Sequence, residues 1–151
     1  MSPDRIEREI VIAAPVEQVW AVLTEPAHLS QWFSEGSPAQ VDLRPGGIMR
    51  VDHAEAGVFP ARIERVEPPW FLSYRWASAY PAEETTDSNS TLVEFTLIPE
   101  AGRTRLRLTE SGFAALVIPA ERLPYSSHES HSAGWTSKLI ELQEYTEKHA
   151  A

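Results

Sequence analysis

Glu110 is the residue whose type and position point most directly to chemistry. The stretch 104–110 alternates, so Leu106, Leu108 and Glu110 share one face of a predicted strand and Glu110 should point inward. A buried carboxylate is costly unless its pKa shifts or it finds a partner. Glu110 could orient a donor group of a ligand, act as a general base, or brace the turn at 111–112. Its natural cationic partners are three strand arginines, Arg50, Arg62 and Arg75, but the sequence alone leaves open which face of the sheet they point to.

Two histidines, His128 and His131, form a second polar pair. Their spacing of three residues places both rings on one face of a helix. Zinc would need at least one further ligand of fixed geometry, and the chain has no cysteine to supply it, so no metal site is predicted. His131 lies one turn before Trp135. It could be a polar group at a cavity mouth that changes protonation near neutral pH, or a helix-start histidine bonded to backbone.

Aromatic residues are the third candidate group. Several project toward the predicted inner face, where they could wall a ligand cavity or simply form the core. Trp20 is assigned to the core because its helix is short. Together with Glu110 and His131, the predicted ligand-binding residues are Trp32, Phe33, Phe59, Tyr74, Trp76, Phe95, Trp135 and Leu139. No catalytic residue is assigned.

A long C-terminal helix is predicted over 128–149. Trp135, Leu139 and Leu142 recur at steps of four and three residues, which is the spacing of one helical face. A helix of that length runs roughly 33 Å. We expect it to lie on a broad concave surface.

The rest of the chain predicts one strand, two short helices and then six strands. The first strand covers 5–13, one helix starts at Pro15 and ends before Pro26, and a second covers 26–33. The later strands are expected at 39–43, 48–53, 58–66, 70–76, 91–98 and 104–110, with a polar connection at 78–90 as the candidate mobile loop. Segregated strands and helices predict an α+β fold with an antiparallel sheet.

Length and composition narrow the function classes. A chain of 151 residues suits a single domain over 1–151 with a substantial core, and the absence of cysteine excludes disulfides and thiolate chemistry. The net charge of −9 argues against nucleic acid as a partner. No apolar run reaches 18 residues, so no membrane span is expected, and the charged N-terminus lacks a signal peptide, which predicts a cytoplasmic protein.

Five stretches resemble one known family in the right order. They are IAAPVEQVWAVLTEPAHLSQWF (12–33), DLRPGG (42–47), RVEPPWFLSYRW (65–76), TRLRLTESGF (104–113) and HSAGWTSKLIELQEY (131–145). The chain is similar to the SRPBCC superfamily (START and birch-pollen-allergen-like proteins), and within it to the family named for the activator of the ninety-kilodalton heat-shock-protein ATPase. The resemblance implies a helix-grip fold: a curved seven-stranded antiparallel sheet around the C-terminal helix, with two short helices near the N-terminus.

The same resemblance implies a cavity between sheet and helix that takes an apolar or amphipathic small molecule in many relatives. The leading hypothesis is therefore a binding protein for such a molecule, without a cofactor, whose polar end would meet Glu110 and His131. One alternative is an interaction module that docks on a chaperone or forms a homodimer. Co-chaperone activity belongs to multidomain members, however, and we expect no second domain here. The other alternative is a cyclase- or hydrolase-like enzyme that uses Glu110 or His131 as acid or base.

Overall fold

A single antiparallel sheet is the frame of the molecule. The computed structural model describes residues 5–32, 40–52, 58–76, 90–113 and 128–149, with backbone alone for 51–52, 58–60 and 130. Within these ranges seven strands run in the order β1-β7-β6-β5-β4-β3-β2. Their bounds are β1 Arg5–Ile12, β2 Gln40–Val41, β3 Ile48–Asp52, β4 Val58–Glu67, β5 Phe71–Trp76, β6 Thr91–Glu100 and β7 Arg103–Ser111.

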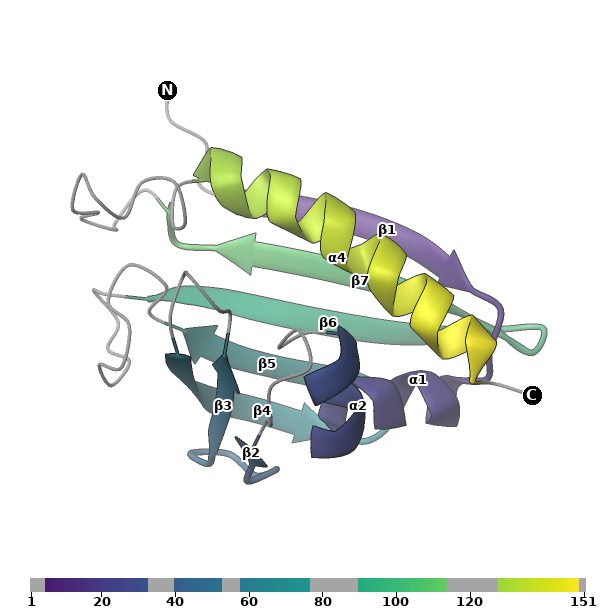
Figure 1. The fold of residues 1–151 in the computed structure, drawn as a ribbon, viewed down its shortest axis with the longest axis horizontal. Coiled ribbons are helices and arrows are strands. Elements are labelled where there is room, and N and C mark those ends of the chain that lie inside the picture. The colour runs from purple at the N-terminus through teal and green to yellow at the C-terminus, as the bar shows by residue number, and fades with distance from the viewer. Residues whose placement is uncertain (1–4, 33–39, 53–57, 77–89, 114–127, 150–151) are drawn as a thin grey trace.

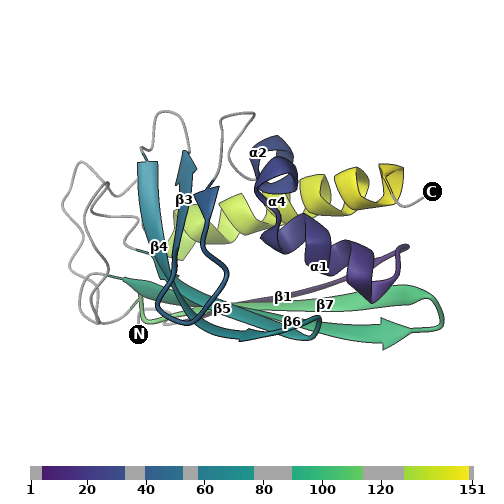
Figure 2. The ribbon, with the colours of Figure 1, turned by 90° about the horizontal axis from the view of Figure 1, so that it is seen from below.

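In the part of the chain that the structure describes, three helices cover one face of this sheet: α1 Val16–Thr24, α2 Pro26–Trp32 and α4 His128–Lys148. Figure 1 shows α4 crossing over β1, β7 and β6. In Figure 2 the β2–β4 end of the sheet turns up beside the helices, so the sheet curls around them. The predicted α+β helix-grip fold, with its element order and long terminal helix, is confirmed.

The two short helices follow from local sequence. Val16, Val19, Val22 and Leu23 are buried on one side of α1. Residue 25 is extended, as expected before a proline, so α1 ends there and α2 begins at once. The assignment of Trp20 to the core was too strong, because this side chain is only partly buried and packs against the core from its rim.

Helix α4 is tied to the outer edge of β1 by side chains. Gln143 Nε2 donates to the carbonyl of Val11 at 2.8 Å, and Glu147 accepts from the backbone N–H of Ala13 at 2.9 Å. At the other end, His128 Nε2 lies 2.9 Å from the carbonyl of Arg5. The hydrogen bond to a backbone group that was considered for His131 is therefore made by His128 instead. These contacts cover a strand edge that would otherwise be open to pairing.

The strand register brings one row of inward-facing residues together. Ile63 on β4 is opposite Tyr74 on β5, Tyr74 is opposite Val93 on β6, Val93 is opposite Glu110 on β7, and Glu110 is opposite Ile6 on β1. All five are buried. Adjacent strands lie about 4.8 Å apart, so the backbones of Tyr74 and Glu110 are separated by roughly 10 Å. The row carries two polar side chains in an otherwise apolar layer.

Candidate functional site

A buried carboxylate cluster is built around Glu110, whose side chain has no exposed surface. One oxygen, Oε2, accepts from Trp76 Nε1 at 2.9 Å and from Thr91 Oγ1 at 2.5 Å. The other, Oε1, accepts from Trp135 Nε1 at 2.7 Å. His131 Nδ1 donates across both oxygens at 2.8 Å. We call these five residues the Glu110 cluster.

Three elements supply the donors of the Glu110 cluster, and β7 supplies Glu110 itself. Trp76 ends β5, Thr91 begins β6, and His131 and Trp135 lie one turn apart on α4. Alternation in β7 points Glu110 inward, as predicted. The helical spacing of His131 and Trp135 directs both rings onto that carboxylate. The cluster therefore fastens the first half of α4 to the sheet.

The charge of Glu110 is stabilised inside the protein. Burial by itself would raise the pKa of Glu110. The charge of His131 and the hydrogen bonds from His131, Thr91 and Trp76 act in the opposite sense and outweigh it, so the pKa lies below the ordinary value for a glutamate. A carboxylate offers about four acceptor positions, and four donors occupy them. Glu110 thus has no acceptor position left for a substrate proton, which argues against a role as general base.

None of the three arginines considered as partners of Glu110 pairs with it among the described residues. Arg62 and Arg75 each pair instead with Glu64, at 2.9 and 3.7 Å, and Arg50 is exposed. The physical reason is facing: each arginine stands next to an inward residue of its strand and therefore points to the outer face. The cation beside Glu110 comes from α4.

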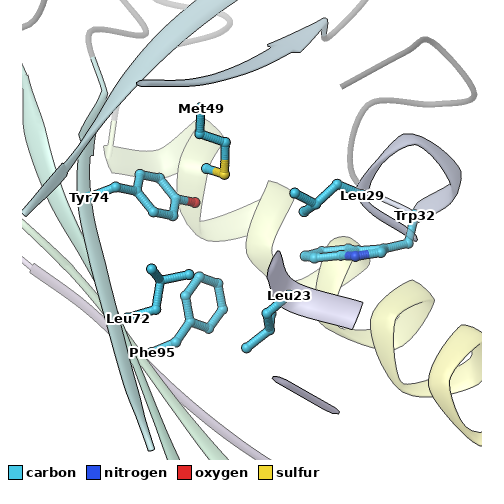
Figure 3. A pocket seen from close by; sticks show the side chains of 7 residues that line it. All are labelled: Leu23, Leu29, Trp32, Met49, Leu72, Tyr74 and Phe95. Carbon is cyan, nitrogen blue, oxygen red and sulfur yellow. The ribbon is translucent and has the colours of Figure 1, made fainter. Parts of the chain in front are cut away.

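A second feature is a small apolar pocket between the sheet and the two short helices. Its lining residues are Leu23, Leu29, Trp32, Met49, Leu72, Tyr74 and Phe95. Figure 3 shows Leu72, Tyr74 and Phe95 projecting from the sheet, with Leu29 and Trp32 from α2 opposite them. The space open to the centre of a water molecule is about 10 Å³, close to the minimum that holds one water.

The hydroxyl of Tyr74 is the polar atom of this pocket. Its Oη is buried and has no hydrogen-bond partner among the described residues. In Figure 3 this oxygen points away from the sheet, toward Met49 and the space before Leu29. Burial raises the pKa of Tyr74 well above its ordinary value, and the charge of Glu110 adds to the effect. The phenol is therefore neutral and keeps its proton.

Aromatic rings connect the pocket to the Glu110 cluster. Tyr74 and Trp76 meet edge to face with ring centres 6.1 Å apart, and Phe95 and Trp135 do so at 5.8 Å. On the far side, the ring of Phe113 lies 5.4 Å from that of His131. The pocket and the cluster are thus neighbours that share walls of aromatic side chains.

The predicted ligand-binding residues fall into separate places. Trp32, Tyr74 and Phe95 line the pocket. Glu110, His131, Trp76 and Trp135 form the cluster, and Leu139 is buried in the core. Phe33 and the side chain of Phe59 lie outside the described residues, as do residues 78–89 of the candidate mobile loop. That any of them binds a ligand stays a prediction.

Four pocket residues were not predicted: Leu23, Leu29, Met49 and Leu72. Periodicity could have found the first two, because both lie on the apolar faces of α1 and α2. Met49 and Leu72 are inward positions of β3 and β5, yet aliphatic residues carry no signal that separates pocket wall from core. The pocket also faces α1 and α2, whereas the expected cavity faced the C-terminal helix.

Two further features concern metals and membranes. Among the described residues, no group of three or more His, Asp or Glu side chains is arranged to hold a metal ion. No helix in the same ranges is long and apolar enough to cross a membrane.

Comparison with known proteins places this geometry in a family. A family model described as Activator of Hsp90 ATPase homolog 1-like protein matches residues 13–147. Comparison with curated proteins finds no significant match. Among solved structures, protein MLL2253 from Mesorhizobium loti is 26% identical with a TM-score of 0.70, over 95% of this chain and 97% of that one.

Two more structures extend the comparison. DynU16, from the dynemicin biosynthetic locus, is 25% identical with a TM-score of 0.72; the match covers 98% of this chain but 49% of DynU16, so this chain spans about half of that protein. The Aha1 dimer from Colwellia psychrerythraea is 18% identical with a TM-score of 0.71, over 95% and 96% of the two chains. This last likeness is one of fold.

Proposed function

The chain belongs to the family of Activator of Hsp90 ATPase homolog 1-like proteins, and from that premise we propose that it binds a small, mostly apolar molecule in the pocket lined by Tyr74. The single observation that carries the proposal is a buried hydroxyl without a partner among the described residues, at the wall of an apolar pocket. Small-molecule sites have this composition: an apolar lining with few polar groups that orient the ligand.

The energetic argument starts from the Tyr74 hydroxyl. A buried polar group that makes no hydrogen bond destabilises the folded protein by about 1–3 kcal/mol. A ligand with a polar atom in reach of Oη removes that penalty, while its apolar part is transferred from water at roughly 25 cal/mol per Å². The first term favours a guest with a polar atom over a pure hydrocarbon, and the second favours a guest with an apolar part over a water molecule.

The pocket must open to admit such a guest, because its present volume suits one water. One wall is suited to move. Met49 is a flexible, unbranched side chain that adapts to different neighbours. Helix α2, in contrast, is fastened by two of its side chains: His28 Nδ1 lies 2.6 Å from Tyr145 Oη, and Trp32 Nε1 donates to the carbonyl of Val22. Truncating Met49 to alanine should therefore strengthen binding of bulky guests.

The test uses a neutral probe and two indole reporters. Tetralin, a ten-carbon bicyclic hydrocarbon, and its ketone 1-tetralone are titrated into ¹⁵N-labelled protein. We expect the indole N–H signal of Trp32, which lines the pocket, to shift with a Kd of about 1 mM or tighter. The exposed indole of Trp70 is the internal control.

A blocking variant makes the test specific. Leu29→Phe adds volume at the pocket wall and should abolish the shift. Ile140→Phe makes the same exchange of aliphatic for aromatic on an exposed site of α4 and should leave it unchanged. If neither compound binds below about 1 mM, or if both variants bind like the parent, the proposal fails.

The chaperone contact and the homodimer remain predictions. Light scattering coupled to size-exclusion chromatography measures the association state directly. If the protein is a monomer at all concentrations, the prediction of a homodimer is wrong. If it forms a stable dimer, its interface should be mapped before any ligand study.

A further inference from the structure

The chemistry of the pocket also indicates which ligands it would accept. We propose that the site selects neutral molecules carrying an oxygen acceptor, a carbonyl or a hydroxyl, and that Tyr74 is the residue that determines this specificity. This inference rests on the function proposed above. It adds a ligand class to that function and assigns the recognition to one atom.

The first step is the direction of the hydrogen bond. Tyr74 is neutral because burial raises its pKa well above the ordinary value. Its Oη therefore presents one O–H donor to the pocket. The buried proton has no acceptor among the described residues. A carbonyl or hydroxyl oxygen of a ligand can accept this hydrogen bond, whereas a pure hydrocarbon offers no acceptor.

The second step excludes anions. The seven lining residues include no lysine, arginine or histidine. A carboxylate in this pocket would be buried without a cation beside it, which is strongly unfavourable.

The third step concerns cations. The aromatic rings of Trp32, Tyr74 and Phe95 could attract an ammonium group. The lining holds no carboxylate, however, and the charge of Glu110 is already engaged by His131 at 2.8 Å. Aliphatic side chains form the rest of the wall and offer an ammonium no acceptor. Neutral molecules are thus the class of ligand that is compatible with all the lining residues.

The experiment compares five molecules with one carbon skeleton. Tetralin, 1-tetralone, 1-tetralol, tetralin-1-carboxylate and 1-aminotetralin are titrated at pH 7 into the parent protein and into Tyr74→Phe, with the Trp32 indole as reporter. In the parent, ketone and alcohol should bind about tenfold more tightly than tetralin, and carboxylate and amine more than tenfold more weakly than the ketone. In Tyr74→Phe, ketone, alcohol and tetralin should bind equally.

The outcomes separate this inference from the proposed function. If tetralin and tetralone bind the parent equally, or if Tyr74→Phe keeps the preference for the ketone, the inference is wrong while binding in the pocket stands. Tightest binding by the carboxylate or the amine also overturns the inference alone. If none of the five binds, the proposed function fails and the inference fails with it. Tyr74→Phe removes one oxygen from a buried ring, and its unfolding transition checks that it folds.

Discussion

Glu110 and Tyr74 lie in the same row of the sheet, and each places a polar group in the interior. They differ in how many hydrogen-bond partners that group has. Glu110 has four donors from four side chains, among them a histidine and two tryptophans. Tyr74 Oη has no partner among the described residues. The side chains of Glu110 and Tyr74 are both buried. The difference supports a structural role for the Glu110 cluster and is consistent with the ligand binding proposed for the Tyr74 pocket.

The comparison predicts its largest effect at Glu110. Glu110→Gln keeps the shape but removes the charge that the four donors surround, and its amide N–H₂ would face donors rather than acceptors. We expect the free energy of unfolding to fall by about 3 kcal/mol, the range for breaking a buried charge pair. Urea unfolding followed by tryptophan fluorescence measures it. A loss below about 1 kcal/mol would mean that the cluster is not a major stabilising element.

Removing one donor should have a smaller effect. Trp135→Phe keeps an aromatic ring but deletes the N–H that Glu110 Oε1 accepts at 2.7 Å. Hydrogen bonds to charged groups contribute about 1.5–3 kcal/mol, so we expect a loss of about 2 kcal/mol. Trp70→Phe, the same exchange at an exposed site, is the matched control and should be close to neutral. Equal effects at the two sites would contradict the role of the indole N–H.

Acid should weaken the cluster in a defined direction. The pKa of Glu110 is lower in the folded protein than its ordinary value of 4.5, so the unfolded chain binds the proton more readily. The stabilisation by Glu110 is then fully present above pH 4.5 and is lost as the pH falls through the lower folded pKa. The measurement is the difference in unfolding free energy between parent and Glu110→Gln as a function of pH. The surface carboxylates Glu9 and Glu100, whose pKa values Arg105 also lowers, are common to both proteins.

Among these substitutions, Tyr74→Phe should be the one that does not destabilise the protein. Because the hydroxyl makes no bond to a described residue, its removal should raise the unfolding free energy, by up to the roughly 1–3 kcal/mol that an unpaired buried polar group costs. Thermal and urea unfolding both report this change. A loss of more than about 1 kcal/mol would show that the hydroxyl has a partner in the folded protein, and the contrast with Glu110 would disappear.

Sequence patterns predicted many of the strands and helices that position Glu110 and Tyr74. Alternation in β7 pointed Glu110 inward, and helical spacing aligned His131 with Trp135. Both patterns are local, because they depend on the geometry of one strand or one helix. The facing of the arginines was left open although the same rule applied: Arg75 lies between the inward residues Tyr74 and Trp76, so alternation alone places it on the outer face.

The sequence by itself determined the family, the order of the elements and the inward direction of Glu110, since each depends on neighbouring residues or on matching words in the chain. The tertiary structure alone decided that His131, and not an arginine, contacts Glu110, and that the Tyr74 hydroxyl has no hydrogen-bond partner among the described residues. Strand register and the position of α4 across the sheet bring together residues that are far apart along the chain. Such pairings arise from packing the whole molecule, and no local period encodes them.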